Sequence, residues 1–288
     1  MVSVIIAAHN EESVLGACLD AVLSSVDGAA EIVVSANGCT DRTAEVAASR
    51  GVRVVDRAQP GKAAALNAAE EITLGFPRIY LDADIVIPRG AVSSVLSRFD
   101  ANPAPLAVVP RRRIVTEGRP WPVKAYFAVN ERLPVFREGL FGRGMITVSE
   151  AGRSRFDTFP EMVADDLFLD SQFTTAEKVE ASDVDILVEA PHTTRDLVNR
   201  LVRVRRGNAQ MRAASTGGEV DAVVRSSDRW SWLRDVVVPE PRLIFAAVPY
   251  VVITLLAGAR ARRAPTAAGS WGRDESTRHA QNDSAERA

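Results

Sequence analysis

The chain has few cysteines, almost no net charge and no internal repeat. The first two features argue against a cysteine-based metal or redox protein and against a nucleic-acid scaffold. Two cysteines, Cys18 and Cys39, occur in 288 residues. Their spacing matches neither a metal site nor a redox motif, and it fits a protein of the reducing cytosol. A net charge of −2 and an isoelectric point near 6.0 argue against a nucleic-acid scaffold. We therefore expect no nucleic-acid partner.

The start of the chain also lacks a signal-peptide pattern. The opening apolar run, residues 2–8, is too brief to span a bilayer, and it has neither a basic lead nor a cleavage region. Hydrophobic residues make up 47% of the chain and charged residues 25%, which is enough to bury a substantial core without disulfides. The composition is consistent with one soluble domain and an appendage.

Apolar strands alternate with helical segments through the first 85 or so residues. Strands are expected at residues 2–8, 31–36 and 52–55, with a helix from Ala63 to Leu74 and a further strand at 79–87. This alternation predicts an α/β fold with a mostly parallel sheet flanked by helices. Such sheets bind ligands beyond the carboxyl ends of their strands. The polar residues expected there are His9, Asn37, Lys62, Asp82 and Asp84.

The segment from Ile79 to Ile87 is the most informative stretch, because an apolar strand carries two acids one residue apart. Alternate side chains of a strand point to the same face, so Asp82 and Asp84 are expected side by side. Neighbouring carboxylates repel each other unless a cation lies between or beside them. Mg²⁺ or Mn²⁺ is the natural cation, and such ions usually hold substrate phosphates. The alternative is that one acid caps the turn before Pro88 while the other is solvated.

The first 215 residues contain five motifs in a fixed order. They are His9-Asn10-Glu11-Glu12, Asn37-Gly38-Cys39-Thr40-Asp41-Arg42-Thr43, Gly61-Lys62-Ala63-Ala64-Ala65-Leu66-Asn67, Asp82-Ala83-Asp84 and Asp165-Asp166. Together they resemble the family 2 glycosyltransferases with a GT-A fold. The resemblance implies a nucleotide diphosphate sugar as donor, a divalent cation held by the aspartate motif, and sugar transfer with inversion.

The resemblance also implies roles for individual residues. Asp84 and Asp82 would hold Mg²⁺ or Mn²⁺. Asn37 stands where many members carry an aspartate that reads the base, and the change from an acceptor-only group to a donor and acceptor leaves the identity of the base open. Lys62 would bring a positive charge to the diphosphate at a helix start, and a mobile surface lysine is the alternative. The expected nucleotide-binding residues are Ala7, His9, Glu11, Asn37, Lys62 and Asp82.

Asp165 and Asp166 follow Pro160 at an expected helix start, and they are the candidates for a catalytic base. A base must take the proton of the acceptor hydroxyl during a single displacement. Adjacent helical residues diverge by about 100° around the axis, so both acids cannot face one hydroxyl. By the family pattern Asp166 aligns with the base, while Asp165 replaces a more usual glutamate. The alternative is that both acids merely favour a helix N-terminus.

Basic and glycine-rich segments lie between and after these motifs. Residues 108–113 are expected to form an edge strand that turns into a basic loop, followed by a helix from Trp121 to Phe136. In the family, the segment corresponding to 139–145 lies near sugar and acceptor, and a plain hairpin turn is the alternative. His192 is a further candidate ligand for metal or phosphate. Candidate contacts to diphosphate or acceptor are Arg195, Arg203, Arg206 and Gly144, with a solvated helical face as the alternative for the arginines.

The C-terminal part has a different character. Residues 243–259 carry no charge and are followed by three arginines. As a helix this run would reach about 25 Å, short of the roughly 30 Å hydrocarbon core, so we expect shallow membrane docking or packing on the domain. The polar run 264–288 predicts a disordered tail. The expected organisation is a GT-A domain at 1–225, a helical, membrane-docking segment at 226–263, and the tail.

The sequence therefore predicts a cytoplasmic, metal-dependent inverting glycosyltransferase, peripheral or monotopic at the inner membrane face, with a sugar, lipid or small molecule as acceptor. Two other hypotheses stay open. A sugar-phosphate nucleotidyltransferase also uses an α/β sheet and metal-binding acids, but the segment after its first strand should be glycine-rich and basic, whereas His9-Asn10-Glu11-Glu12 is acidic. The other hypothesis is a noncatalytic sugar-nucleotide-binding module of a membrane complex, against which the acids of the aspartate motifs argue.

Overall fold

The computed structural model describes residues 1–26, 30–161, 164–218 and 228–263, and these fall into two compact units. Unit 1 holds the described residues of 1–113 and 140–188, and unit 2 holds those of 114–139, 189–218 and 228–263. The predicted domain boundary at 225–226 and the predicted disordered tail at 264–288 lie outside the described residues.

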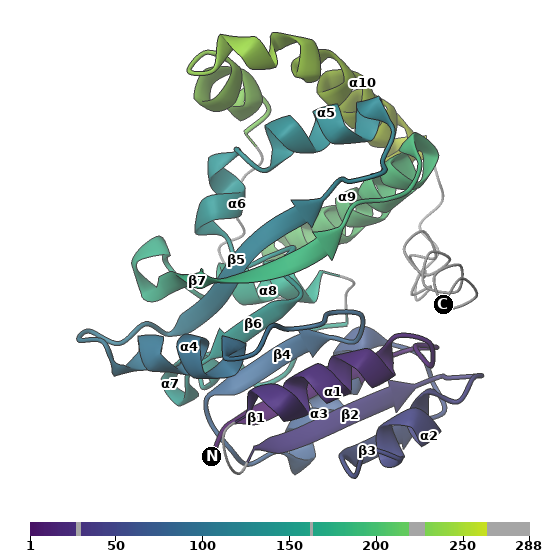
Figure 1. Cartoon of the computed structure of the whole chain (residues 1–288), viewed down its shortest axis with the longest axis vertical. Helices are drawn as coiled ribbons and strands as arrows, with labels where there is room; N and C mark the ends of the chain where they lie inside the picture. Colours follow the sequence, from purple (N-terminus) through teal and green to yellow (C-terminus); the bar gives the residue numbers. More distant parts are fainter. Residues whose placement is uncertain (27–29, 162–163, 219–227, 264–288) are drawn as a thin grey trace. The chain divides into compact units, whose positions relative to one another are not determined.

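Unit 1 is built on a seven-stranded sheet with the strand order β3-β2-β1-β4-β6-β5-β7 (Figure 1). The strands are β1 (Ser3–Ala8), β2 (Glu31–Asn37), β3 (Arg53–Arg57), β4 (Arg78–Asp82), β5 (Ala107–Val115), β6 (Met145–Val148) and β7 (Lys178–Glu189). β1 pairs in parallel with β2 and β4, and β2 with β3, whereas β6 runs antiparallel to β4 and β5. The predicted α/β fold is confirmed, with the parallel strands first in the chain.

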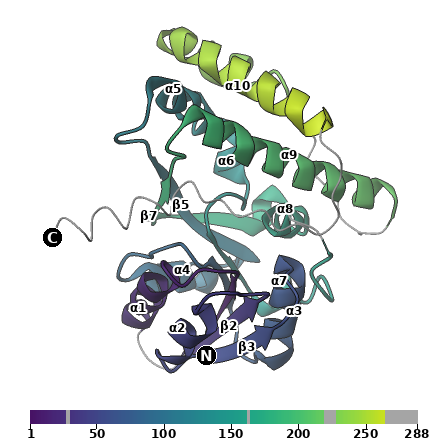
Figure 2. The same cartoon turned by 90° about the vertical axis from the view of Figure 1, so that its right-hand side faces the viewer.

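Helices cover both faces of the parallel strands. They are α1 (Leu15–Ser25), α2 (Thr43–Ala48), α3 (Lys62–Ile72), α4 (Ala91–Ser97), α7 (Glu150–Arg153) and α8 (Asp165–Ser171), with the 3₁₀ turns η1 (Arg98–Asp100) and η2 (Thr175–Glu177). α1, α2 and α4 lie on one face, and α3 and α7 on the other (Figure 2). Alternation along β1 explains the two layers, because Val4 and Ile6 pack with α1 and α4 while Ile5 points to the opposite face.

Unit 2 is helical. Its elements are α5 (Trp121–Asn130), α6 (Pro134–Glu138), α9 (Thr194–Thr216), the π-helix η3 (Trp232–Val237), the 3₁₀ turn η4 (Pro241–Leu243) and α10 (Ile244–Arg263). Val123 of α5, Leu197 of α9 and Ile253 of α10 belong to one buried apolar cluster. The predicted helix from Trp121 to Phe136 is wrong, because Pro134 lacks an N–H and holds Leu133 in an extended conformation, so a second helix begins there.

The predicted strand from Ile79 to Ile87 is wrong at its carboxyl end. The ladder with β1 ends where Ala7 pairs with Asp82, and on the other side Asp82 N–H donates to Gly144 O (2.8 Å), one residue before β6 begins. With no strand left to pair with, the chain turns, and Ile85 N–H donates to Asp82 O (3.1 Å). Asp82 is therefore the last residue of β4, and Asp84 lies in the turn after it.

The predicted edge strand at residues 108–113 is wrong, because β5 lies inside the sheet between β6 and β7. β5 pairs with β6 only at Ala107 and Val108, so the missing N–H of the later Pro110 interrupts no bond of that ladder. On the β7 side, Arg111 and Arg113 both form ion pairs with Asp185. The sequence predicts an edge strand here because Asp185, the acidic partner of the basic segment, is some 70 residues away in the chain.

Candidate functional site

The loops after β1 and β2 are tied together at the carboxyl ends of the parallel strands. Asn10 Oδ1 accepts a hydrogen bond from Thr40 N–H (2.7 Å), and Thr43 Oγ1 accepts one from Glu11 N–H (2.7 Å). The first two sequence motifs therefore form one hydrogen-bonded structure. Two of the predicted nucleotide-binding residues, His9 and Glu11, lie within it.

Asn37, the last residue of β2, holds this structure to the start of α3. Its side chain is fully buried, with Nδ2 donating to Ala8 O (2.8 Å) and Oδ1 accepting from Gly61 N–H (2.9 Å). Its backbone carbonyl accepts a hydrogen bond from His9 Nδ1 (2.7 Å). The side chain thus binds backbone groups on both sides, and the expected contact with a base stays a prediction.

Asn37→Ala is expected to lower the free energy of unfolding by about 2 kcal/mol or more, because it leaves a buried N–H and a buried carbonyl without their partner. Chemical denaturation checks this expectation. The matched control is Asn199→Ala, which truncates an exposed amide on α9 and should change stability by less than about 0.5 kcal/mol. Equal stabilities of the two variants would contradict the assigned role.

A lysine lies between two carboxylates beyond the ends of β1 and β4. Lys62, the first residue of α3, donates from Nζ to Asp82 Oδ1 (2.8 Å), and the same atom lies 3.0 Å from Asp165 Oδ2. The three side chains are partly shielded, with exposed fractions of 23%, 45% and 15% for Lys62, Asp82 and Asp165. Burial opposes the charged ammonium, but the carboxylates of Asp165 and Asp82 outweigh it and raise the pKa of Lys62.

Asp166 stands beside this cluster with a different environment. Its Oδ2 accepts a hydrogen bond from Gly142 N–H (3.1 Å), and its Oδ1 accepts one from Leu167 N–H (2.8 Å). Burial, and then the negative charge of Asp165, raise the pKa of Asp166 to about 6. Burial likewise raises the pKa of Asp165, although the charge of Lys62 acts against it. The two acids therefore differ in environment, since Asp165 is ion-paired with Lys62 while the raised pKa of Asp166 lies closer to neutral pH.

Both ends of α8 are held by residues that had no predicted role. Asn67 clamps the preceding segment, because its Oδ1 accepts from Phe159 N–H (2.7 Å) and its Nδ2 donates to Phe159 O (2.9 Å). At the other end of α8, the buried Asp170 accepts from Leu140 N–H (2.9 Å) and pairs with Lys178 Nζ (2.8 Å). Asn67 is the last residue of the third motif, and this position is the one feature of the sequence that could have identified it as a site residue.

Asp84 and Asp82 are the candidates for a metal site, and the residues fit a hard divalent cation. Asp84 is exposed in the turn, and Asp82 is the more accessible partner of Lys62. Gly144 keeps the space beside them open, because it has φ +71° and an added Cβ would lie 2.4 Å from Ile85 Cγ1 and 3.6 Å from Asp82 Oδ2. The described ranges contain no group of three or more His, Cys, Asp and Glu side chains able to bind a metal. Two carboxylates leave positions for phosphate oxygens and water, as Mg²⁺ and Mn²⁺ prefer.

The remaining predicted site residues lie apart in the chain. Ala7 is buried in β1 opposite Ser35 and Asp82. The others belong to unit 2, where His192 precedes α9 and the basic residues lie on that helix, and their roles stay predictions; they are His192, Arg195, Arg203 and Arg206.

Comparison with known proteins gives matches to part of the chain and to nearly all of it. The profile described as Glycosyl transferase family 2 matches residues 3–153, just over half of the chain. Glucosyl-3-phosphoglycerate synthase from Mycobacterium tuberculosis strain ATCC 25618 / H37Rv is 34% identical over 96 residues, 30% of this chain and 30% of that protein. The protein of the same name from Mycolicibacterium paratuberculosis is 33% identical over 96 residues, 30% of this chain and 29% of that protein. The chain thus spans less than a third of the length of these curated relatives.

Among solved structures, the mannosyltransferase PcManGT from Pyrobaculum calidifontis, in complex with GDP-Man and Mn²⁺, superimposes with a TM-score of 0.61. The match covers 99% of this chain and 79% of that one at 18% sequence identity. At this identity the likeness establishes the fold, which is of the GT-A type. Asp165 and Asp166 lie beyond the residues matched by the family profile.

Proposed function

Because the chain belongs to glycosyl transferase family 2, we propose that this glycosyltransferase moves a sugar from a nucleotide diphosphate donor to a hydroxyl acceptor with inversion. The observation that carries the proposal is the cluster in which Lys62 bridges Asp82 and Asp165. It lies beyond the carboxyl ends of parallel strands, where α/β sheets bind ligands.

The leaving group of this reaction is a nucleoside diphosphate, on which negative charge accumulates as the anomeric bond breaks. Asp84 and Asp82 would hold Mg²⁺ or Mn²⁺, and the bound ion would neutralise part of that charge. Lys62 contributes an ammonium that is held in place by Asp82 and Asp165. The first N–H groups of α3, which begins at Lys62, also attract anions. His9, Glu11 and the backbone fixed by Asn37 border the nucleoside.

Asp166 is proposed as the base. It takes the proton of the acceptor hydroxyl while that oxygen attacks the anomeric carbon and the diphosphate leaves on the opposite side, so a single displacement inverts the configuration. A pKa near 6 supports this role, because the carboxylate is ionised at neutral pH and still basic enough to accept a proton. Asp165 is a positioning residue that holds Lys62.

We place the reaction in the cytosol, where sugar nucleotides are made, with the enzyme peripheral or monotopic at the inner face of the membrane. The described residues contain one helix, Pro241–Arg263, that is long and apolar enough to cross a membrane by length and composition alone. The acceptor class stays open among sugars, lipids and small molecules.

Nucleotide diphosphate sugars should raise the melting temperature of the protein in the presence of Mn²⁺. A ligand at about 100 times its dissociation constant adds about 2.7 kcal/mol of stability, which a thermal-shift screen of UDP, GDP, dTDP and CDP sugars detects. The same screen without Mn²⁺ isolates the contribution of the metal. Slow hydrolysis of the stabilising donor would then show that the chain is catalytic.

The rival hypotheses make different predictions in the same screen. The melting temperature of a nucleotidyltransferase would rise with nucleoside triphosphates and with sugar phosphates. It would change little with nucleotide sugars whose base differs from that of the enzyme's own nucleotide. A noncatalytic binding module would be stabilised by a donor that stays intact over long incubation. If no nucleotide sugar stabilises the protein with or without Mn²⁺, the proposed function is wrong.

A further inference from the structure

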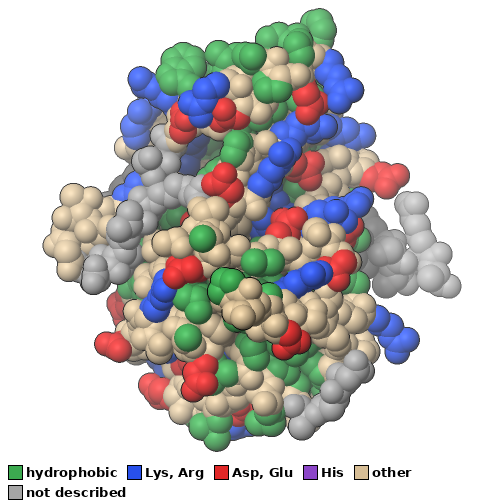
Figure 3. All heavy atoms as spheres, turned by 90° about the vertical axis from the view of Figure 1, so that its left-hand side faces the viewer, with side chains coloured by type: hydrophobic (Ala, Val, Ile, Leu, Met, Phe, Trp, Pro, Cys, Tyr) green, Lys and Arg blue, Asp and Glu red, His purple; other side chains and the backbone are tan. Residues whose placement is uncertain are grey.

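One face of α10 is apolar and exposed. Its large exposed residues recur at helical spacing and lie along one side of the helix; they are Ile244, Phe245, Val248, Val252, Leu255 and Leu256, with exposed fractions between 49% and 77%. We call this set the outer face of α10. In Figure 3, hydrophobic side chains gather on unit 2, with Lys and Arg beside them.

The opposite face of α10 is part of the core of unit 2. Ile253 and Ala257 are buried in a cluster with Val123 of α5 and Leu197 of α9, and Tyr250 stacks on Tyr126 with ring centroids 5.1 Å apart. To cross a bilayer, α10 would have to leave these partners or take the arginine-rich α9 with it. Both are costly in hydrocarbon, so α10 is suited to lie along a membrane surface rather than through it.

Cations are concentrated at the carboxyl end of this helix. The last turn of α10 carries Arg260, Arg262 and Arg263, and α10 contains no acidic residue. At 100° per residue, Arg263 falls in line with Phe245 on the outer face, with Arg260 and Arg262 on its flanks. From α9, Arg205 reaches α10 as well, since its Nη1 lies 3.6 Å from an added Cβ at Gly258.

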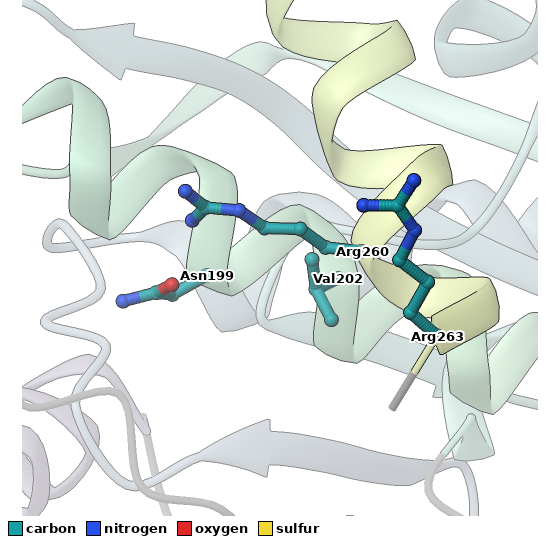
Figure 4. A pocket seen from close by; sticks show the side chains of 4 residues that line it. All are labelled: Asn199, Val202, Arg260 and Arg263. Carbon is teal, nitrogen blue, oxygen red and sulfur yellow. The ribbon is translucent and has the colours of Figure 1, made fainter. Parts of the chain in front are cut away.

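Two of these arginines line a pocket between α9 and α10. The pocket, about 390 Å³ in volume, is bordered by Asn199, Val202, Arg260 and Arg263. In Figure 4 the Arg260 guanidinium extends over α9 toward Asn199, while Arg263 rises from the end of α10. Guanidinium groups and an amide at an opening next to an apolar face match the chemistry of a lipid, whose phosphate carries negative charge and whose tails are apolar.

We propose that the outer face of α10 and the arginine pocket dock onto a bilayer that contains anionic phospholipids, with α10 parallel to the membrane and a lipid phosphate bound by Arg260 and Arg263. The apolar residues enter the boundary between headgroups and acyl chains, and the arginines stay at the level of the phosphates. This inference specifies the surface behind the proposed location, and it does not depend on the proposed sugar transfer.

Flotation of the full-length protein with vesicles tests the proposal. The wild type should bind vesicles of phosphatidylcholine mixed with phosphatidylglycerol, and bind far less to phosphatidylcholine alone. The double variant Val248→Glu, Leu255→Glu should reduce the partition coefficient about tenfold or more, since it places charges on the inserted face. The double variant Arg260→Glu, Arg263→Glu should reduce the partition coefficient by a similar factor. High salt should weaken the binding of the wild type to the same vesicles, because it screens the charges.

Matched controls separate docking from a general effect of added charge. Leu74→Glu introduces the same change at an 80% exposed leucine of unit 1, and Arg89→Glu reverses the charge of an exposed arginine there. Both variants should bind vesicles as the wild type does.

The altered side chains of α10 are exposed, so Mn²⁺-dependent nucleotide binding should persist in all variants. Vesicle binding that is equal in the α10 variants and the controls would overturn the proposal. So would a wild-type dimer that ignores vesicles and dissociates with Val248→Glu, Leu255→Glu.

Discussion

Asp166→Asn is expected to lower kcat by about 10²- to 10⁴-fold while leaving donor affinity close to that of the wild type. Asparagine keeps the shape of the side chain, and its oxygen can still accept the hydrogen bond from Gly142 N–H. It cannot take the proton of the acceptor hydroxyl, which affects the transition state rather than the bound donor. Steady-state kinetics at saturating donor, together with calorimetric titration of the nucleotide, separate the two quantities.

Asp165→Asn is the matched comparison, because it changes the neighbouring acid in the same way. Asp165 contacts Lys62, so we expect a higher KM for the donor and a smaller loss in kcat. If Asp165→Asn loses most of its kcat while Asp166→Asn stays active, Asp165 is the base and the proposed roles are reversed.

The pH profile of the wild type gives a readout that does not rely on substitution. Asp166 is protonated below its pKa of about 6 and cannot act as a base there. The rate should therefore fall about tenfold for each pH unit below that value and level off above it. Removing the negative charge of Asp165 favours the ionised form of Asp166, so in Asp165→Asn this limb should move to lower pH.

Asp84→Asn is expected to abolish the Mn²⁺-dependent part of the stabilisation by a nucleoside diphosphate and to lower turnover by orders of magnitude. The amide keeps one oxygen but loses the negative charge that binds a hard cation. Asp84 is exposed in a turn, so the melting temperature of the protein alone should change little. Thermal shifts with UDP or GDP, measured with and without Mn²⁺, report both effects.

Asp157→Asn serves as the control for this variant, because it neutralises another exposed aspartate of unit 1. Its metal-dependent shift should equal that of the wild type. An unchanged shift in Asp84→Asn would remove Asp84 from the metal site. A loss of the shift in both variants would point to an effect of net charge instead.

The sequence predicted those features that depend on neighbours along the chain. The apolar runs placed polar residues at the ends of β1, β2 and β4, and the motif around Lys62 marked the start of α3. The helix start at Asp165 followed from a proline and two acids before an apolar run. In each case the hydrophobic period and the local chemistry point to the same structure.

The sequence could not predict contacts between distant segments. β4 ends at Asp82 because its partner β6, more than 60 residues later, begins only at Met145. β5 is an inner strand because β7, which carries the ion-pair partner Asp185, lies beside it. Asn67 ends a motif, but nothing near it in the sequence indicates that it binds the backbone of Phe159, 92 residues away. These features are set by tertiary packing, which overrides local propensity.

The cluster around Lys62 also bears on the order in which ligands enter the site. Asp82 and Asp165 pair with one ammonium, that of Lys62, and Asp166 follows Asp165 in the chain, so carboxylates outnumber the ammonium before any ligand arrives. A diphosphate that approached alone would meet net repulsion at close range. A dication bound first cancels this negative charge, so we expect the metal to bind before the nucleotide.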